Sequence, residues 1–481
     1  MKLKKLITNL PIEVYRGSKE VEITGMALHS KRVAPGYLFI AKQGTTDDGI
    51  KYIDEAVSSG AVAILTNYPD PFLKNVVQLI YSNGNSCEAQ LAARFYGHPS
   101  QSLFTIGVTG TNGKTTISYL IQHLLERSGM IGTLEYLVGT HRFKAELTTP
   151  DVITTQKLLK EMLKQQLNTA ILEVSSHGLA QGRVDEIDFD LAVFSNLTQD
   201  HLDYHRSMEE YAQEKGKLFS KLSEQKRAIV NLDSPWVETI LEHCSAQLFT
   251  YGFSKNADLH AHDLLLKADG TDFSVTYRQE SVRFHWQLIG QFNVLNALAA
   301  IAVCLVRGMD LKQLPSLLST FTAVPGRLEK VENSKGFHIF VDFAHTPDAL
   351  ESVLCCLKEI DHRKIITVFG CGGDRDRTKR AVMGQIADRY SSFTLVTSDN
   401  PRTEDPLSIC EEIVSGFTSS NYVIEVNRQK AIEQAIERAT PEDLILIAGK
   451  GHEAYQLIMH QTLPFDDKQV VQTIVNQEPV A

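Results

Sequence analysis

Apolar runs of strand length recur along the chain, and from about residue 103 they alternate with helical stretches. The run at 103–109 predicts a strand, 115–128 predicts the helix that follows it, and 169–174 predicts another strand before a loop. This order is typical of βαβ units around a mostly parallel sheet. We therefore assign the chain to the α/β class.

A second series of strand-like runs begins after a Pro-Gly junction at residues 324–328. Helices fit between these runs, so this block predicts a doubly wound, Rossmann-like α/β domain. The predicted strands are 337–343, 365–369, 393–397 and 444–448.

The first 98 residues differ because their β-rich segments are short. One helix is expected at 88–95, ending before the linker Gly97-His98-Pro99. The predicted strands are 21–23, 37–40, 61–65 and 76–79. The predicted domains are 1–98, 99–329 and 330–481, and three domains suit 481 residues at about 100–200 residues each.

Composition narrows the class of protein. With 43% hydrophobic and 8% aromatic residues the chain has enough apolar side chains to fold, and a net charge of -10 argues against a broad nucleic-acid-binding face. The longest apolar run, 294–306, is shorter than the roughly 20 residues of a membrane-spanning helix. The N-terminus lacks signal-peptide features, and seven scattered cysteines form no C-x-x-C pair. We expect a cytoplasmic protein that neither spans a membrane nor binds nucleic acid.

The most informative motif is TGTNGKTT at residues 109–116, between a predicted strand and a predicted helix. Glycines let backbone N–H groups curl around phosphate oxygens, and the helix points its positive end at them. Lys114 would neutralise the terminal phosphates, and Thr115 is placed to bind Mg²⁺. The usual pattern has glycine where this chain has Val108, and the alternative is a glycine turn that only closes a strand–helix corner. We expect a nucleotide-binding loop.

Polar residues also follow two other predicted strands. Glu173 stands near the end of one, and a dense polar cluster at 196–205 follows another. Glu173 is a candidate for a second Mg²⁺, and His201 is a candidate metal ligand. His201 and His205 would also suit zinc, but no H-E-x-x-H is present and oxygen-rich surroundings favour Mg²⁺. A solvent-exposed polar loop without metal is the alternative.

Further motifs stand in a fixed order along residues 100–470. They are TGTNGKTT (109–116), EVSSHGL (173–179), SNLTQDHLDYH (195–205), PGRLE (325–329), DFAHTPDAL (342–350), FGCGGDRD (369–376), DNPR (399–402) and AGKGHE (448–453). In this combination the chain resembles the Mur ligases.

The resemblance implies an ATP-dependent amide ligase of peptidoglycan synthesis, and hence of cell-wall biogenesis, cell shape and cell division. Its three α/β domains would bind a UDP-sugar, ATP and an amino acid in turn, in a cytoplasmic monomer. ATP would phosphorylate the D-glutamyl γ-carboxylate of UDP-N-acetylmuramoyl-L-alanyl-D-glutamate, and the amine of meso-2,6-diaminopimelate would displace phosphate. Mg²⁺ is the implied cofactor.

In the Mur ligases a lysine after the D-H-L-D-Y-H run is carbamylated and helps to bind Mg²⁺. The matching segment is 211–220, in which alignment selects Lys215 rather than Lys217. Without the resemblance, both would be solvated lysines on a helix face. The implied catalytic residues are Lys114, Glu173, His201 and Lys215. The implied metal ligands are Thr115, Glu173, His201 and carbamylated Lys215.

The resemblance also assigns residues to ATP and the UDP-sugar. For ATP they are Gly110, Thr111, Asn112, Gly113, Lys114, Thr115, Thr116, Asn293, Asn296, Arg327 and Asp342. For the UDP-sugar they are Leu28, Ser30, Thr45, Thr46, Asp47, Thr148, Thr149, Ser175, Gln181 and Arg183. The family's D-S-R pattern is replaced here by His29-Ser30-Lys31, which is a departure in the uridine region.

The choice of amino acid depends on the far end of its side chain. Diaminopimelate has a carboxylate and an amine there, whereas lysine has only an amine. Arg402 offers a planar fork that fits a carboxylate, and Arg375 offers a second; without the motif, Arg402 would be a surface or capping arginine. The implied diaminopimelate residues are Arg375, Asp399, Asn400, Pro401, Arg402, Gly449 and Glu453.

Other functions stay open. A ligase that adds L-lysine, or one resembling folylpolyglutamate synthases, would share the acyl-phosphate chemistry. A nucleotide switch or small-molecule kinase would use the phosphate loop but need neither the UDP-sugar nor diaminopimelate. A non-catalytic binding module is least favoured, because Lys114, Thr115, Glu173 and His201 occur together. A dinucleotide site at 370–375 is disfavoured because Arg375 occupies the third glycine position of the fingerprint.

Overall fold

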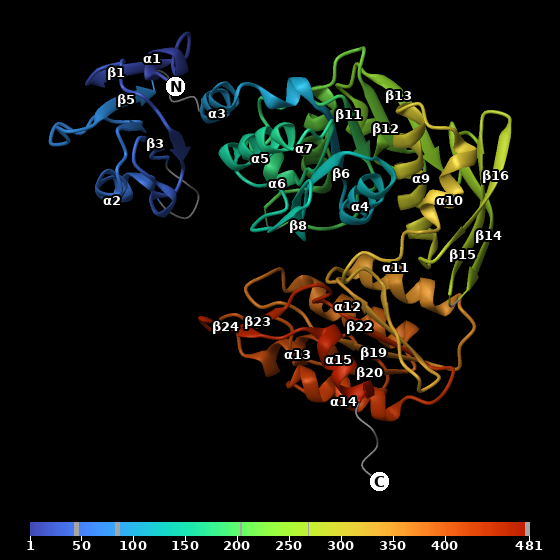
Figure 1. The fold of residues 1–481 in the computed structure, drawn as a ribbon. Helices are drawn as coiled ribbons and strands as arrows, with labels where there is room; N and C mark the ends of the chain where they lie inside the picture. Colours follow the sequence, from blue (N-terminus) through green and yellow to red (C-terminus); the bar gives the residue numbers. More distant parts are fainter. Residues whose placement is uncertain (43–47, 82–86, 203, 268, 477–481) are drawn as a thin grey trace. The chain divides into compact units, whose positions relative to one another are not determined.

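The structure is a computed structural model that describes residues 1–42, 48–81, 87–202, 204–267 and 269–476. The chain forms two compact units. One comprises Met1–Gly107 and Arg127–Leu191, and the other comprises Val108–Glu126 and Ala192–Ala481. Strand β6 (Phe104–Thr109) begins in the first unit and ends in the second (Figure 1).

A five-stranded sheet forms the N-terminal part of the first unit. Its order is β1-β5-β4-β3-β2, in which β2 to β5 are parallel and β1 is antiparallel to β5. The elements are β1 (Ile12–Arg16), β2 (Gly25–Ala27), β3 (Tyr37–Ile40), β4 (Ala63–Thr66), β5 (Val77–Tyr81), α1 (Leu3–Leu6), α2 (Ile53–Ser58) and α3 (Glu88–Tyr96). The strand predicted at 21–23 is wrong. Glu22 makes a single bridge to Lys2, and the amide of Thr24 bonds to Gly36 instead of continuing the ladder.

Alternating side chains of β3 pack on the two faces of this sheet. Leu38 and Ile40 join α1 and α3 in one hydrophobic cluster, whereas Phe39 packs with α2 in another. This is the period-two pattern that a strand with both faces covered requires. The first cluster also contains Val152 and Ile153 of α5, which joins the sheet to the rest of the unit.

Residues 127–191 complete the first unit. Strand β7 is parallel to β10 and antiparallel to β8, and β9 extends the antiparallel part. The elements are β7 (Ser128–Ile131), β8 (Glu135–Val138), β9 (His141–Lys144), α5 (Val152–Lys164), β10 (Thr169–Glu173) and α6 (Ser176–Ala180). The helix predicted at 115–128 is wrong beyond Leu124, because Arg127 adopts a left-handed φ of 53° and Ser128 begins β7.

The second unit begins with α4 (Lys114–Leu124) and continues through strands in the order β11-β12-β13-β14-β15-β16. Strands β12 to β14 are parallel, whereas β14 to β16 form an antiparallel meander that the sequence did not predict. The elements are β11 (Leu191–Phe194), α7 (Met208–Ser220), β12 (Arg227–Asn231), α8 (Val237–Leu241), β13 (Gln247–Gly252), β14 (Leu259–Lys267), β15 (Gly270–Tyr277), β16 (Glu280–Trp286), α9 (Gln291–Val306) and α10 (Leu314–Leu318). Helix α9 packs on α4 and on β12 to β14.

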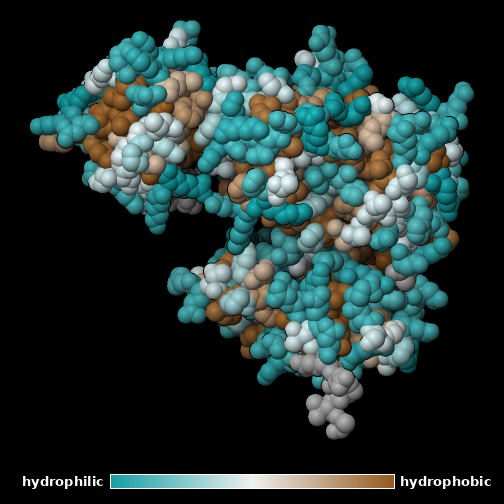
Figure 2. All heavy atoms as spheres, viewed as in Figure 1, coloured by the Kyte–Doolittle hydropathy of each residue, from teal (hydrophilic) through white to brown (hydrophobic). Residues whose placement is uncertain are grey.

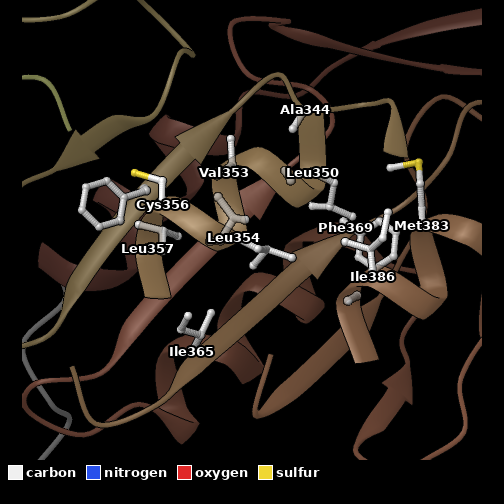
Figure 3. Close-up of a cluster of buried hydrophobic side chains, with 14 of the residues drawn as sticks. Ala344, Leu350, Val353, Leu354, Cys356, Leu357, Ile365, Phe369, Met383 and Ile386 are labelled. Carbon is white, nitrogen blue, oxygen red and sulfur yellow. The ribbon is translucent and has the colours of Figure 1, made fainter. Parts of the chain in front are cut away.

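The rest of the second unit has a six-stranded sheet, β17-β18-β22-β19-β20-β21, parallel except for β17. The elements are β17 (Glu329–Val331), β18 (His338–Asp342), α11 (Pro347–Lys358), β19 (Ile365–Phe369), α12 (Thr378–Tyr390), β20 (Phe393–Val396), α13 (Pro406–Val414), β21 (Tyr422–Ile424), α14 (Arg428–Arg438), β22 (Leu444–Ala448), β23 (Tyr455–Ile458), β24 (Gln461–Pro464) and α15 (Asp467–Asn476). Helices α11 to α13 cover one face, shown in Figure 3, and α14 and α15 cover the other. The doubly wound sheet is confirmed.

The loops after β19, β20 and β22 leave the same, carboxyl edge of this sheet, because those strands are adjacent and parallel. Ligands of doubly wound folds bind at this edge.

On the face drawn in Figure 2 hydrophilic residues predominate, with hydrophobic ones in small groups. Within the described ranges, no helix has the length and hydrophobicity that crossing a membrane requires.

Candidate active site

Two glycines shape the loop between β6 and α4. Gly110 has a φ of 147°, and a Cβ there would lie 1.9 Å from the Oγ of Ser195. Gly113 has a φ of 87°, and a Cβ there would lie 2.4 Å from the Oδ1 of Asn296. Side chains are excluded at both positions, so the backbone curls closely before α4 begins at Lys114. Such a loop at a helix N-terminus suits phosphate oxygens.

The loop is held by the polar segment that follows β11. The amide of Thr111 donates to the carbonyl of Asn196 at 2.9 Å. The amide of Asn112 donates to the side-chain Oδ1 of Asn196, also at 2.9 Å. Lys114 Nζ donates to the carbonyls of Gly110 and Thr111 at 3.0 and 2.8 Å. Two motifs that the sequence singled out separately therefore lie together.

Tyr211 on α7 links these motifs, and the sequence did not identify it as functional. Its hydroxyl lies 3.2 Å from the Oγ1 of Thr111, and its ring stacks on His205 at 5.0 Å. The edge of the ring faces His201 at 6.2 Å, and Lys215 Nζ lies 4.5 Å from its centre. The i, i+4 spacing of Tyr211 and Lys215 on a helix was the one available signal.

The structure separates the two lysines of α7. Lys215 is 1% exposed, and its Nζ donates to the carbonyl of Gly110 at 2.8 Å. Burial, with a contribution from Lys114, lowers the pKa of Lys215 well below 10.5. Lys217 is 56% exposed and pairs with Glu214 at 2.7 Å. Only Lys215 therefore has surroundings that favour an uncharged amine.

His201 has a left-handed φ of 55°, which is uncommon outside glycine and often marks a functional position. Its Nε2 lies 3.5 Å from the Oδ2 of Asp200. Burial opposes ionisation of Asp200, yet His201, His345 and Lys379 together lower its pKa. Within the described residues no three His, Cys, Asp or Glu side chains group as metal ligands. A metal here would therefore need other donors, such as a hydroxyl or a modified lysine.

Other residues predicted for ATP lie near the loop or at the junction after α10. Asn296 Nδ2 donates to Asn293 Oδ1 at 3.2 Å, and Asn293 Nδ2 donates to the carbonyl of Ile289 at 2.8 Å. Thr115 and Thr116 are buried in the first turn of α4. Because Asn296 lies close to Gly113, the two asparagines are placed beside the phosphate loop.

Asp342 at the end of β18 holds the backbone of the junction. Its carboxylate accepts from the amides of Leu328 at 2.5 Å and Ala344 at 2.7 Å. Burial raises its pKa, and Arg327 counteracts the shift. The guanidinium of Arg327 lies 4.5 Å from the ring centre of Phe343. Arg327 is thus close enough to Asp342 for its charge to act on the carboxylate, and their assignment to ATP stays a prediction.

Asp348 at the start of α11 contacts the phosphate loop, and no role was predicted for this residue from the sequence. Its Oδ2 accepts from Asn112 Nδ2 at 2.9 Å and from Thr198 Oγ1 at 3.0 Å. Burial raises the pKa of Asp348. The residue thus connects the C-terminal sheet region to the phosphate loop.

In the first unit, Glu173 ends β10 with its side chain fully buried. Its Oε1 accepts from the amide of Thr133 at 3.0 Å and its Oε2 from the hydroxyl of Thr133 at 2.8 Å. A Cβ at Gly132 would lie 2.3 Å from Oε1. The hydroxyl of Thr133 also lies 3.1 Å from that of Thr148, so Glu173 is held in a tight polar cradle.

The residues predicted for the UDP-sugar peptide form a connected network beside Glu173. Thr149 Oγ1 donates to the Glu173 carbonyl at 2.9 Å and lies 3.1 Å from the Oγ of Ser175. Arg183 donates to the carbonyl of Thr149 at 2.8 Å and to the Oε1 of Gln181 at 2.6 Å. The sequence therefore located residues that fold into one polar surface.

The first unit has a cavity of about 780 Å³. It is lined by Leu28 from the N-terminal sheet region, and by Leu147 and Pro150, which flank Thr148 and Thr149. Ser30, which follows Leu28 closely in the sequence, is buried. Its Oγ donates to the Oε2 of Glu55 at 2.7 Å. Three residues predicted for the UDP-sugar lie outside the described residues, namely Thr45, Thr46 and Asp47.

Two arginines approach each other at the carboxyl edge of the C-terminal sheet. Arg402 has a left-handed φ of 51°, and its Nη1 donates to the carbonyl of Gly373 at 2.7 Å. Burial lowers the pKa of Arg402, and the charge of Arg375 adds to the shift. A Cβ at Gly372 would lie 2.9 Å from Arg402 and 3.8 Å from the side chain of Arg375. Two arginines whose charges act on each other favour an anionic ligand.

The other residues predicted for diaminopimelate lie on adjacent loops. Asn400 Nδ2 donates to Glu453 Oε2 at 2.8 Å, which joins the loops after β20 and β22. Gly449 has a φ of 113°, and a Cβ there would lie 2.5 Å from the carboxylate of Asp399. Pro401 accepts at its carbonyl from Glu404. The loops after β20 and β22 thus combine acidic and basic groups, which suit a ligand that carries both a carboxylate and an ammonium.

Models of three protein domains match this chain in order. The Mur ligase family catalytic domain matches residues 22–96, the Mur ligase middle domain matches 108–304, and the Mur ligase glutamate ligase domain matches 326–451. A UDP-N-acetylmuramoyl-L-alanyl-D-glutamate--2,6-diaminopimelate ligase of Chlamydia felis is 44% identical over 485 residues, 99% of each chain. The chain belongs to the Mur ligase family.

Solved Mur ligase structures share the whole fold. A UDP-N-acetylmuramoyl-L-alanyl-D-glutamate--2,6-diaminopimelate ligase is 32% identical, with a TM-score of 0.69 over 99% of each chain. The MurF ligase of Thermotoga maritima in complex with ADP is 19% identical and has a TM-score of 0.66, over 94% of this chain and 96% of its own. The three-domain α/β architecture expected from the sequence is confirmed.

Proposed function

We propose that this chain is an ATP-dependent ligase that joins meso-2,6-diaminopimelate to the D-glutamyl γ-carboxylate of UDP-N-acetylmuramoyl-L-alanyl-D-glutamate, in peptidoglycan synthesis. The observation that carries the proposal is 44% identity over 99% of both chains with a ligase of that name. Arg375, Arg402 and Glu453 lie on the loops after β19, β20 and β22, and the presence of both basic and acidic groups on adjacent loops supports the choice of amino acid. We further propose that the protein works in the cytoplasm as a monomer, with domains at 1–98, 99–329 and 330–481.

The reaction needs activation because a carboxylate and an amine do not condense in water. A γ-carboxylate oxygen attacks the terminal phosphorus of ATP, and ADP leaves. The amine nitrogen then attacks the acyl carbon, phosphate leaves with that carboxylate oxygen, and the nitrogen loses its proton. Lys114 supplies positive charge to the transferring phosphoryl group from the N-terminus of α4. The glycine loop and Asn293, Asn296, Arg327 and Asp342 are assigned to ATP.

The residues assigned to Mg²⁺ are Thr115, Glu173, His201 and carbamylated Lys215, and their hydroxyl, carboxylate, imidazole and carbamate groups are donors whose chemistry suits that ion. Bound Mg²⁺ would supply positive charge to phosphate oxygens in transfer. Burial lowers the pKa of Lys215 and so favours its unprotonated amine, which could attack CO₂ and lose a proton, creating an N–C bond and an anionic carbamate oxygen. A protonated lysine would instead repel the metal.

Other surfaces are assigned by their chemistry. Thr148, Thr149, Ser175, Gln181 and Arg183 supply hydrogen-bond donors to the UDP-muramoyl peptide, and Leu28 lines the cavity of the first unit. In the C-terminal region, Arg402 and Arg375 are assigned to the distal carboxylate of diaminopimelate and Glu453 to its ammonium. Asp399, Asn400, Pro401 and Gly449 complete that pocket.

An amino-acid panel tests the proposal. Purified protein, ATP, Mg²⁺ and UDP-muramoyl dipeptide are assayed for phosphate release with meso-diaminopimelate, L-lysine, L-glutamate or no amine. We expect release with diaminopimelate alone. Exclusive use of L-lysine would overturn the choice of amino acid while leaving the ligase intact. Phosphate release without dipeptide would point to a kinase or switch, and use of a folate substrate would point to a folylpolyglutamate synthase.

A further inference from the structure

Lys450 lies between β22 and β23, and its side chain is 0% exposed. Its Nζ donates to Asn400 Oδ1 at 3.1 Å and to Glu453 Oε2 at 3.2 Å, and lies 4.0 Å from Asp399 Oδ1. Burial of an ammonium is unfavourable unless charged or polar partners replace water. The partners that compensate Lys450 all lie on the loops assigned to diaminopimelate.

The two oxygens of the Glu453 carboxylate have different surroundings. Oε2 accepts from both Lys450 and Asn400, whereas the hydroxyl of Tyr455 lies 3.5 Å from Oε1. The Glu453 side chain is 19% exposed, so a ligand can still reach it. Lys450 therefore holds Oε2 of Glu453 in place and leaves Oε1 oriented toward the distal ammonium of a ligand.

Lys450 also acts on the segment that carries Arg402. Asn400 Oδ1 accepts from the amide of Leu457 at 2.9 Å as well as from Lys450. The amide of Arg402 donates to the carbonyl of Leu457 at 3.0 Å, and Met459 donates back to Arg402 at 2.6 Å. Both loops are thus tied to the β23–β24 hairpin, and the Lys450 ammonium is buried between them.

Charge adds a second effect. Asp399 and Glu453 bring two negative charges to this part of the site, and Lys450 offsets one of them. Without the ammonium, the surroundings of Arg402 would be more negative. A more negative site favours a purely cationic side chain over one that ends in both an ammonium and a carboxylate.

We propose that Lys450 is a positioning residue that sets the choice between diaminopimelate and L-lysine. It does so by holding Glu453 and Asn400 and by offsetting one acidic charge beside Arg402. The inference rests on the proposed function, because it assumes that these loops bind the incoming amino acid.

The test uses Lys450→Met, which keeps the length of the side chain and removes its charge, and Lys450→Gln, which keeps polarity. We measure kcat and KM for diaminopimelate and for L-lysine, and KM for ATP and UDP-muramoyl dipeptide. We expect KM for diaminopimelate to rise about tenfold and the kcat/KM ratio of diaminopimelate to lysine to fall about tenfold or more, with the other KM values unchanged. If Lys450→Met does not fold, Lys450→Gln decides.

Lys364→Met is the matched control. Lys364 pairs with the buried carboxylate of Asp443 at 3.4 Å, but it precedes β19 at the opposite edge of the same sheet. This variant should lower the melting temperature and leave the amino-acid ratio unchanged. An unchanged ratio in the Lys450 variants, or an equal change in the control, would overturn the inference. Failure of the proposed function is distinguishable, since it appears in the wild-type amino-acid panel before any variant is made.

Discussion

Two buried lysines in this protein have opposite surroundings. Lys215 on α7 is 1% exposed, its Nζ donates to a backbone carbonyl, and the described residues give it no ion pair. Lys114 adds a second positive charge nearby, and the pKa of Lys215 falls well below its ordinary value. Lys450 after β22 is also fully buried, but Glu453 and Asp399 lie within ion-pair distance.

The difference shows how burial can give one residue type two uses. Burial without a paired carboxylate favours loss of the proton from Lys215, although the charge of Asp200 acts in the opposite direction, and an unprotonated amine can react with CO₂. Burial beside carboxylates supplies the compensating charge, and the lysine then fixes neighbouring side chains. We propose that the region around the phosphate loop uses the chemistry of Lys215, whereas the loops after β20 and β22 use the position and charge of Lys450.

The largest effect is expected at Lys215. Lys215→Ala should lower kcat by about three orders of magnitude, because it removes the nitrogen that we propose to be carbamylated. Phosphate release is the measurement, and formate or acetate should restore part of the activity by replacing the anionic oxygens. Lys217→Ala is the control and should resemble wild type. Full activity of Lys215→Ala without added acid contradicts the contrast between the two buried lysines.

Arg402→Ala tests the amino-acid region. It should lower kcat/KM for diaminopimelate about a hundredfold, since charge-assisted bidentate hydrogen bonds are lost. KM for ATP should stay at its wild-type value. Steady-state kinetics with each substrate varied separates the two constants. An unchanged kcat/KM for diaminopimelate in this variant would contradict the assignment of Arg402 to the distal carboxylate.

Stability gives an independent test of Lys215. Because its folded pKa is depressed, the unfolded chain binds more protons at this group between the folded pKa and 10.5, so wild-type stability rises with pH across that window. In CO₂-free buffer, Lys215→Met should raise the free energy of unfolding by about 1–3 kcal/mol near neutral pH. The gain should shrink as pH approaches 10.5. Urea titrations at several pH values measure it, and a less stable variant would argue against an uncompensated buried amine.

The smallest effect is expected at Asn296, whose side chain approaches Gly113 in the phosphate loop. Asn296→Ala should raise KM for ATP about fivefold, the magnitude of one lost hydrogen bond. KM for diaminopimelate should not change, because that site lies on other loops. Equal changes in both constants would show that the two regions do not act separately.

Buried strands were the part of the fold that the sequence predicted best. The segments 37–40, 365–369 and 444–448 coincide with β3, β19 and β22, because continuous apolar runs bounded by turns specify strands covered on both faces. The β14–β16 meander was missed. Strands β14 and β16 alternate more and less buried positions, whereas β15 is buried over most of its length. No helix separates the three strands, so the βαβ pattern gave no signal for them.

Candidate site residues could be predicted from the sequence where they belong to local motifs. Contacts that depend on tertiary packing could not. The glycine loop, Glu173 and Arg402 follow from local motifs. The contacts of Thr111 with Tyr211 and of Asn112 with Asp348 join residues 100 and 236 positions apart. Long-range pairs of this kind depend on how helices pack, which a single sequence does not encode in its spacing.

The most direct measurement follows the oxygen of the activated carboxylate. UDP-muramoyl dipeptide labelled with ¹⁸O in the D-glutamyl γ-carboxylate is incubated with the protein, ATP, Mg²⁺ and meso-diaminopimelate. Ligation through an acyl phosphate predicts that each phosphate released carries one ¹⁸O, and that the peptide gains one diaminopimelate. Unlabelled phosphate, or phosphate released without a new amide bond, would contradict the account.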